Sequence, residues 1–313
     1  MDNGTVLIEQ ERRAYDPAED PINMRAWTLQ EHILPRRRLI FGTRELWWIC
    51  ESAVSFDTLP TRRIENDPAV QRKSGSDRFS LDYWRSIVRD YTQWYLTDPN
   101  DKLSAIAGVA DLYSQFFNSI YLAGPWEFSL LSELMWCSIR SDITRPLAQR
   151  APSWSWASVD EEVHHNWCPL DPGPHAPKIV ECHITPISQS SPFGPIDTSG
   201  CVLRIKGTLV KAVWQEDRQY ISIARMGRRR VPETGEFIET EVYSRMGRTH
   251  ADALEVNPPK EVWVLPIIQD PIRGLLLAHV EGDVYRRVGL VLRLRAETLM
   301  PADNEVRTIS III

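Results

Sequence analysis

The sequence predicts an α+β protein in which a helical N-terminal half packs on a mostly antiparallel, β-sandwich or barrel-like C-terminal half. Two features of the residue pattern carry this prediction. Apolar residues recur at helical spacing before about residue 150, and they alternate with a period of two after it. We therefore expect a helical region with a short strand pair at 1–150 and a β-rich region at 151–313, which could also form one continuous fold.

Three helices are expected in the N-terminal half after a shorter one at about Asn23 to Leu34. The clearest of these helices has apolar and aromatic residues at every fourth position over 79–91. The second follows the capping run at 98–101, and the third follows Gly124-Pro125, where the missing proline N–H is tolerated in a first helical turn. Two short strands are expected at 38–41 and 46–50.

The C-terminal half is expected to contain many short strands. Alternation at 153–157 places Trp154 and Trp156 on one face of a strand. Further β-rich runs, separated by proline and glycine, lie at 178–185, 202–214, 220–224, 261–268, 274–280, 285–294 and 307–313. Such spacing is typical of a sandwich or barrel.

The tetrapeptide Arg-Met-Gly-Arg occurs twice, at 225–228 and 245–248. We expect these copies to be glycine-containing turns with solvated arginines, because four residues are too few to define a structural repeat. The alternative is that they form two arms of a basic hairpin that grips an anion.

Composition narrows the functional class. The chain has 313 residues and a net charge of -6, so a nucleic-acid partner is not expected. The chain contains no signal-peptide-like start and no run of roughly 18 apolar residues, which predicts a cytoplasmic protein without a membrane partner. The five scattered cysteines are expected to be free thiols in a reducing compartment. They are Cys50, Cys137, Cys168, Cys182 and Cys201.

Several blocks carry a family resemblance. Residues 25–31 read R-A-W-T-L-Q-E, 101–108 read D-K-L-S-A-I-A-G, and 151–158 read A-P-S-W-S-W-A-S. The runs G-L-L-L at 274–277 and Y-R-R-V-G at 285–289 follow in the same order. Together these blocks resemble the C-terminal two-thirds of the fungal heterokaryon-incompatibility (HET) domain family.

The resemblance also implies what not to expect. Family members are distantly TIR-like, and NAD cleavage and cell-death signalling are expected from an N-terminal region with "S-Y-x-W-G" and "D-x-x-C-I-N-Q" blocks. Neither block occurs in this chain. We therefore expect a HET-like protein that lacks the NADase-like half and is not an NADase.

Glu31 and His32 are the first candidate catalytic residues. Trp27 and Glu31 lie four residues apart and share one helix face. Glu31 could then be a carboxylate tuned by the aromatic ring, with His32 as its acid–base partner. In the alternative, the helix only packs, and Glu31 bonds Arg25 or Arg38.

The tryptophans suggest a ligand pocket. Trp27, Trp47, Trp154 and Trp156 are the candidate ligand-binding residues, because aromatic side chains with few polar groups line apolar pockets. The competing interpretation is that these rings fill a core between helices and sheet.

Asp160 and His164 are the second candidate catalytic pair. They begin a run of acid–base groups at 160–183 and could stand at a pocket mouth, or be solvated loop residues. His165 and Cys168 are zinc-ligand types, but no C-x-x-C or H-E-x-x-H core accompanies them, so no metal site is expected.

These features lead to competing functional hypotheses. The first is a small-molecule-binding protein with an aromatic-lined pocket for an apolar ligand. Such a protein could be a cofactor-independent cyclase, isomerase or lyase of fungal secondary metabolism. The second is a non-self-recognition or regulatory module that binds a protein partner without enzymatic activity. The third is an inactive remnant. The sequence leaves the oligomeric state open.

Overall fold

The computed structural model describes residues 20–41, 46–50, 79–166, 172–215, 217, 219–230, 237–269, 271–294 and 306–312. The backbone alone is described at 46–50, 224–230, 237–246 and 269. The described helices all lie before residue 160. They are η2 (Pro21–Met24), α1 (Thr28–Ile33), α2 (Leu81–Thr92), η4 (Pro99–Lys102), α3 (Ser104–Phe117), η5 (Glu127–Ser129), α4 (Leu130–Glu133) and η6 (Trp156–Ser158).

Helices α2 and α3 form the centre of the N-terminal core. Ser80 caps α2 by accepting a hydrogen bond from the Tyr83 amide at 3.2 Å, and Asn118 ends α3 in the left-handed region. The Trp84 ring packs 5.2 Å from Tyr113 and 5.5 Å from Trp126, measured between ring centroids. These aromatic contacts join the two helices to the segment that follows them.

The strands dominate the rest of the chain. They are β1 (Arg37–Phe41), β2 (Leu46–Cys50), β3 (Cys137–Ser138), β4 (Val163–His164), β5 (Lys178–Pro186), β6 (Ile196–Thr208), β7 (Val210–Trp214), β8 (Tyr220–Arg230), β9 (Phe237–Ala251), β10 (Glu261–Gln269), β11 (Ile272–Glu281), β12 (Val284–Leu294) and β13 (Val306–Ile312). Each strand run expected after residue 177 therefore exists.

Six of these strands close an antiparallel barrel in the order β11-β10-β7-β8-β9-β12, with β12 pairing back to β11. β13 continues from β12 in parallel register, and β6 and β5 extend the sheet beyond it. Because β12 pairs with β11, the six-stranded barrel is closed and has no edge strand. All six contribute buried apolar side chains to one cluster, which fills the barrel interior.

Two glycines permit the close approach of barrel strands. A Cβ at Gly274 would lie 2.1 Å from the Leu265 carbonyl oxygen, and one at Gly289 would lie 2.4 Å from the His250 carbonyl oxygen. Backbone atoms cannot move aside as a flexible side chain can, so both positions require glycine. Both glycines lie in sequence runs noted above, at 274–277 and 285–289.

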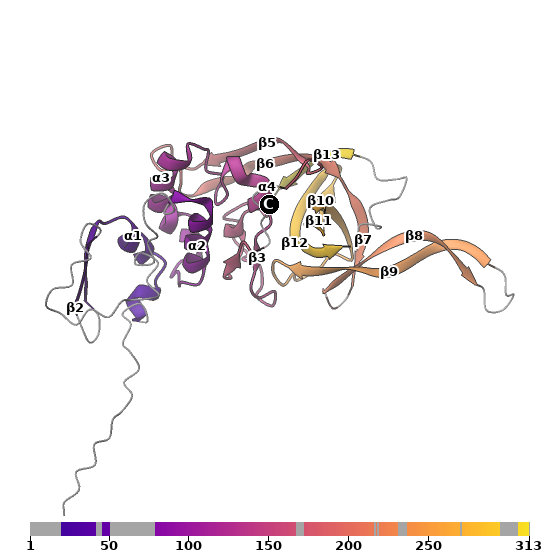
Figure 1. Cartoon of the computed structure of the whole chain (residues 1–313), viewed down its shortest axis with the longest axis horizontal. Coiled ribbons are helices and arrows are strands. Elements are labelled where there is room, and N and C mark those ends of the chain that lie inside the picture. Colours follow the sequence, from indigo (N-terminus) through magenta and orange to yellow (C-terminus); the bar gives the residue numbers. More distant parts are fainter. Residues whose placement is uncertain are drawn as a thin grey trace, which may run out of the picture.

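β6 connects the barrel to the helices. Its residues Ile196 and Cys201 belong to the core around α2 and α3, whereas Leu203 and Ile205 belong to a core on the outer face of the barrel. Figure 1 shows β5 and β6 running from the helical end of the molecule to the barrel. The helices and the barrel are therefore joined by one continuous strand pair.

The Arg-Met-Gly-Arg tetrapeptides are not turns. The first lies within β8 and the second within β9, and these two strands pair with each other. The β8–β9 ribbon projects from the barrel in Figure 1. The expectation of two turns is wrong because glycine inside a strand does not by itself end it.

The predicted fold class is also wrong. Strand residues outnumber helical ones, and no helical N-terminal half packs on a sandwich in the described residues. The third expected helix is reduced to η5 and the four-residue α4. The reason is that Trp126, Leu130, Leu134 and Met135 are all fully buried, so their apolar character reports burial on every side rather than a helical face.

Two further sequence expectations can be compared with the structure. Cys137, Cys182 and Cys201 are free thiols, as expected, while Cys168 lies outside the described residues and Cys50 is described by its backbone alone. No helix in the described ranges has the length and apolar character needed to cross a membrane.

Glu133 is a buried carboxylate that holds the start of η5. Its Oε2 accepts a hydrogen bond from the Trp126 amide at 2.7 Å, and its Oε1 lies 3.7 Å from Nε of Arg85. The side chain is 1% exposed. Burial raises the pKa of Glu133 to about 7, although the Trp126 amide and Arg85 act in the opposite direction.

The raised pKa predicts a pH-dependent stability. Between pH 4.5 and about 7 the folded protein retains a proton on Glu133 that the unfolded chain releases, so stability falls as pH rises through this window. The loss should reach about 3 kcal/mol, and Glu133→Gln should remove it. Urea denaturation across the window measures the slope. Glu127→Gln, on the exposed neighbouring turn, is the control and should keep the wild-type slope; a wild-type slope in Glu133→Gln would contradict this account.

Candidate functional site

The first two family-like blocks pack directly against each other. Nε2 of Gln30 donates hydrogen bonds to the Ser104 and Ala105 carbonyl oxygens at 3.2 and 3.0 Å. Trp27, which is 42% exposed, donates from Nε1 to Oδ2 of Asp101 at 3.3 Å. These contacts bind α1 to the start of α3, and they place Trp27 on the surface rather than in a pocket.

Glu31 and His32 have different surroundings. Glu31 is exposed, whereas His32 is buried, with Nε2 3.1 Å from Oδ1 of Asn23 and its ring edge-on to Trp94. An acid–base pair needs both groups to reach one reacting atom. The structure does not bring these two side chains into a shared cavity.

Trp154 and Trp156 do not form one face of a strand. Trp154 lies in a turn and packs in the core on the outer face of the barrel, whereas Trp156 starts η6 and packs in the helical core. Both are almost completely buried. The strand expectation is wrong because the Ser155 side chain caps η6, which turns the two rings toward different cores. The side chain of Trp47 lies outside the described part of the structure.

Asp160 and His164 also lie apart from each other. Asp160 is exposed and forms an ion pair with Arg150. Nε2 of His164 lies 3.0 Å from Oε1 of Glu162, and His164 lines a pocket of about 200 Å³ beside α2. Within the described residues no cluster of three or more His, Cys, Asp or Glu is arranged to hold a metal ion.

A different group of residues forms the candidate site, which we call the arginine pocket. It has a volume of about 370 Å³ and is lined by residues 145–151, Ser153, Ser158, 254–257 and Arg286. Its walls include Ala151, Ser153 and Ser158 of the block at 151–158 and Arg286 of the β12 block at 285–289. Two of the family-like blocks therefore meet at this pocket.

The floor of the arginine pocket carries an excess of positive charge. Nε of Arg145 and Nη1 of Arg286 lie 3.3 and 2.7 Å from the same oxygen, Oε1 of Glu255. Arg150 is buried and donates to the Ala157 and Val159 carbonyl oxygens at 2.7 and 2.8 Å. Arg145 and Arg286 thus share Glu255, whereas Arg150 pairs with Asp160 outside the lining. The lining residues include three arginines and one glutamate, which makes the pocket suited to an anion.

The rim of the arginine pocket is apolar. Leu147 is 98% exposed, Val256 is 83% exposed and Leu254 is 50% exposed. The Leu254 amide donates to the Ile143 carbonyl oxygen at 2.8 Å, which holds the two rim segments side by side. Exposed aliphatic side chains around charged groups are typical of surfaces that bind other molecules.

The pocket depends on a buried ion pair behind it. Nε and Nη2 of Arg287 each donate to Asp252 at 2.9 Å, and both side chains are fully buried. Nη2 of Arg145 lies 3.8 Å from the same carboxylate. Arg145 also donates hydrogen bonds to Ser158 Oγ at 3.1 Å and to the Arg287 carbonyl oxygen at 3.5 Å, so it links the pocket to the buried pair.

Sequence reasoning missed Arg145, Arg150 and Arg286. The available signal was the position of the family-like blocks, since Ser153, Ser158 and Arg286 lie inside them. Nothing in the spacing of Arg145 or Arg150 indicated that they would converge, because the convergence depends on a long-range contact between the 145–151 and 254–257 segments.

Comparisons with known proteins add no assignment. The sequence matches no protein-family profile, no curated protein and no solved structure.

The buried pair yields a stability prediction. Asp252→Ala leaves the Arg287 guanidinium buried without its carboxylate, and this should lower the free energy of unfolding by about 3–5 kcal/mol. Urea denaturation measures the change. Asp142→Ala is the matched control, because Asp142 bonds Arg140 at 3.0 Å in an exposed pair, and its unfolding midpoint should stay at the wild-type value. Equal midpoints for the two variants would show that the Asp252–Arg287 pair does not anchor the fold.

Proposed function

We propose that this chain is a recognition module that binds an acidic protein segment carrying aliphatic or aromatic side chains at the arginine pocket. The observation that carries the proposal is the pairing of an arginine-rich floor with exposed Leu147, Leu254 and Val256 at the rim. The resemblance to HET proteins supports a role in non-self recognition or in regulating a HET-type partner.

The chemistry of the pocket fits a protein segment. Arginine and large apolar side chains are enriched where protein interfaces gain most of their binding energy, and guanidinium groups pair with carboxylates in fixed geometry. Arg286 is the best placed of the arginines for this role, because its side chain is 25% exposed beside Glu255. An incoming carboxylate would therefore share Arg286 with Glu255.

The aromatic small-molecule enzyme is the less supported hypothesis. Trp154 and Trp156 are packed into two separate cores, and neither lines the arginine pocket. Glu31 is exposed, His32 is buried against Asn23, Asp160 pairs with Arg150, and of these four candidates only His164 lines a pocket, so the expected acid–base pairs do not share a cavity.

Peptide selection tests the proposal. Peptides selected from a random display library on the purified protein should be enriched in Asp or Glu together with Leu, Ile or Phe. Leu147→Ser and Arg286→Gln should each raise the Kd of a selected peptide by about tenfold or more, measured by fluorescence anisotropy. Binding should also weaken as salt increases, because the pocket attracts its partner electrostatically.

Matched variants distinguish this pocket from the rest of the surface. Ile187→Ser changes an aliphatic side chain that is 69% exposed, and Arg204→Gln changes an arginine that bonds Glu181 at 3.0 Å on the β5–β6 pair. Both should leave peptide affinity at the wild-type value. Selected peptides without acidic enrichment, or with affinities indifferent to Leu147→Ser and Arg286→Gln, would refute the proposal.

A further inference from the structure

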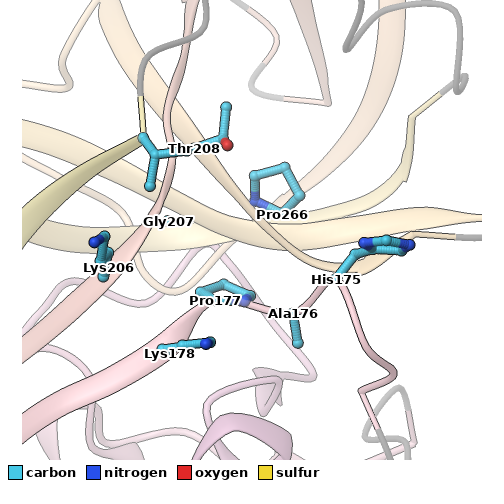
Figure 2. A pocket seen from close by; sticks show the side chains of 9 residues that line it. His175, Ala176, Pro177, Lys178, Lys206, Gly207, Thr208 and Pro266 are labelled. Atoms are coloured by element: carbon cyan, nitrogen blue, oxygen red, sulfur yellow. The ribbon is translucent and has the colours of Figure 1, made fainter.

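A second pocket lies where β5, β6 and β10 meet, and Figure 2 shows it from close by. It has a volume of about 510 Å³ and shares no lining residue with the arginine pocket. Its lining residues are His175, Ala176, Pro177, Lys178, Lys206, Gly207, Thr208, Pro266 and Val306. We call it the dilysine pocket.

Two lysines of this pocket stand directly opposite each other. Lys178 of β5 is the register partner of Lys206 of β6, and both side chains are exposed. Side chains at such positions lie about 5 Å apart at Cβ, and like charges there destabilise the strand pair. In Figure 2 the two lysines lie on the same side of the pocket.

Two other exposed cations on this sheet are paired with carboxylates. Arg204, also on β6, bonds Glu181 of β5 at 3.0 Å, and Lys211 of β7 bonds Glu261 of β10 at 2.9 Å. Lys178 and Lys206 form no ion pair with any carboxylate in the part of the chain that the structure describes. No acidic residue lines the dilysine pocket either. Within the described residues, no carboxylate therefore compensates the repulsion between the two ammonium groups.

The pocket keeps its shape because β6 approaches its neighbours closely. A Cβ at Gly207 would lie 2.7 Å from Cδ1 of Leu265 and 3.0 Å from Cβ of Pro177. The Thr208 hydroxyl adds a hydrogen-bond donor, and Pro177, Pro266 and Val306 add apolar wall. The pocket thus combines two ammonium groups and a hydroxyl with a surface that an organic group can cover.

We propose that the dilysine pocket binds a small organic molecule that carries a phosphate group. A phosphate brings close to two negative charges, which match the opposed ammonium groups of Lys178 and Lys206 and relieve their repulsion. The organic part contacts the proline and valine walls. The volume lies within the range of about 300–1,000 Å³ that small-molecule sites occupy. This site is independent of the arginine pocket and of its proposed protein partner.

Calorimetric titration with phenyl phosphate tests the proposal, with inorganic phosphate titrated in parallel. Phenyl phosphate should bind saturably and more tightly than inorganic phosphate, because its ring adds contacts with the apolar wall. Lys178→Gln and Lys206→Gln should each weaken phenyl phosphate binding by about tenfold or more, the effect expected for losing one hydrogen bond to a charged group. Lys211→Gln, which alters an exposed lysine paired with Glu261, should leave the affinity unchanged.

Melting temperatures distinguish a loss of binding from a loss of folding in the two lysine variants. Removing one of two opposed like charges should leave the melting temperature of Lys178→Gln and Lys206→Gln equal to or above that of the wild type, so weakened binding would not reflect unfolding. The proposal is overturned if phenyl phosphate shows no saturable binding up to about 10 mM, an affinity near the weak limit for small ligands. It is equally overturned if inorganic phosphate binds as tightly, or if both lysine variants keep the wild-type affinity.

Discussion

The buried guanidinium of Arg287 is the contact on which the arrangement of this protein depends. It donates two hydrogen bonds to Asp252, and Nη1 and Nη2 donate to the Leu134 and Trp136 carbonyl oxygens, each at 2.6 Å. Its Cζ atom lies 3.7 Å from the Trp136 ring centroid. A buried charge is tolerated only when hydrogen-bonding partners surround it. Because the two carbonyl partners come from the segment after α4, they hold that segment against β12 of the barrel.

The arginine pocket follows from this anchor. Successive residues of a strand face opposite sides, so the burial of Arg287 directs its neighbour Arg286 outward toward Glu255. Arg145 reaches both Asp252 and Glu255 and so ties the pocket floor to the buried pair. The position of the pocket at the surface therefore follows from a contact in the core, and Ser153, Ser158 and Arg286 of its lining lie within blocks that also contain buried residues.

The two pockets are distinguished by the charges of the residues that line them. Some exposed cations have a carboxylate nearby, as Arg204 has Glu181, and such exposed pairs contribute little to stability. The arginine pocket and the dilysine pocket instead hold more cations than acids, although the whole chain carries a net charge of -6. The tryptophans, in contrast, serve packing: Trp84, Trp126, Trp136, Trp154 and Trp156 are among the largest fully buried side chains.

The sequence alone determined the strands after residue 177 and the amphipathic helix α2, because period and capping are local properties. It could not determine the barrel, since closure depends on the pairing of β11 with β12, nor the fate of Trp154 and Trp156, whose rings enter different cores after a serine-capped turn. The candidate site was decided by tertiary structure for the same reason. Arg145 and Glu255 are distant in the chain, and only the folded arrangement brings their charges together.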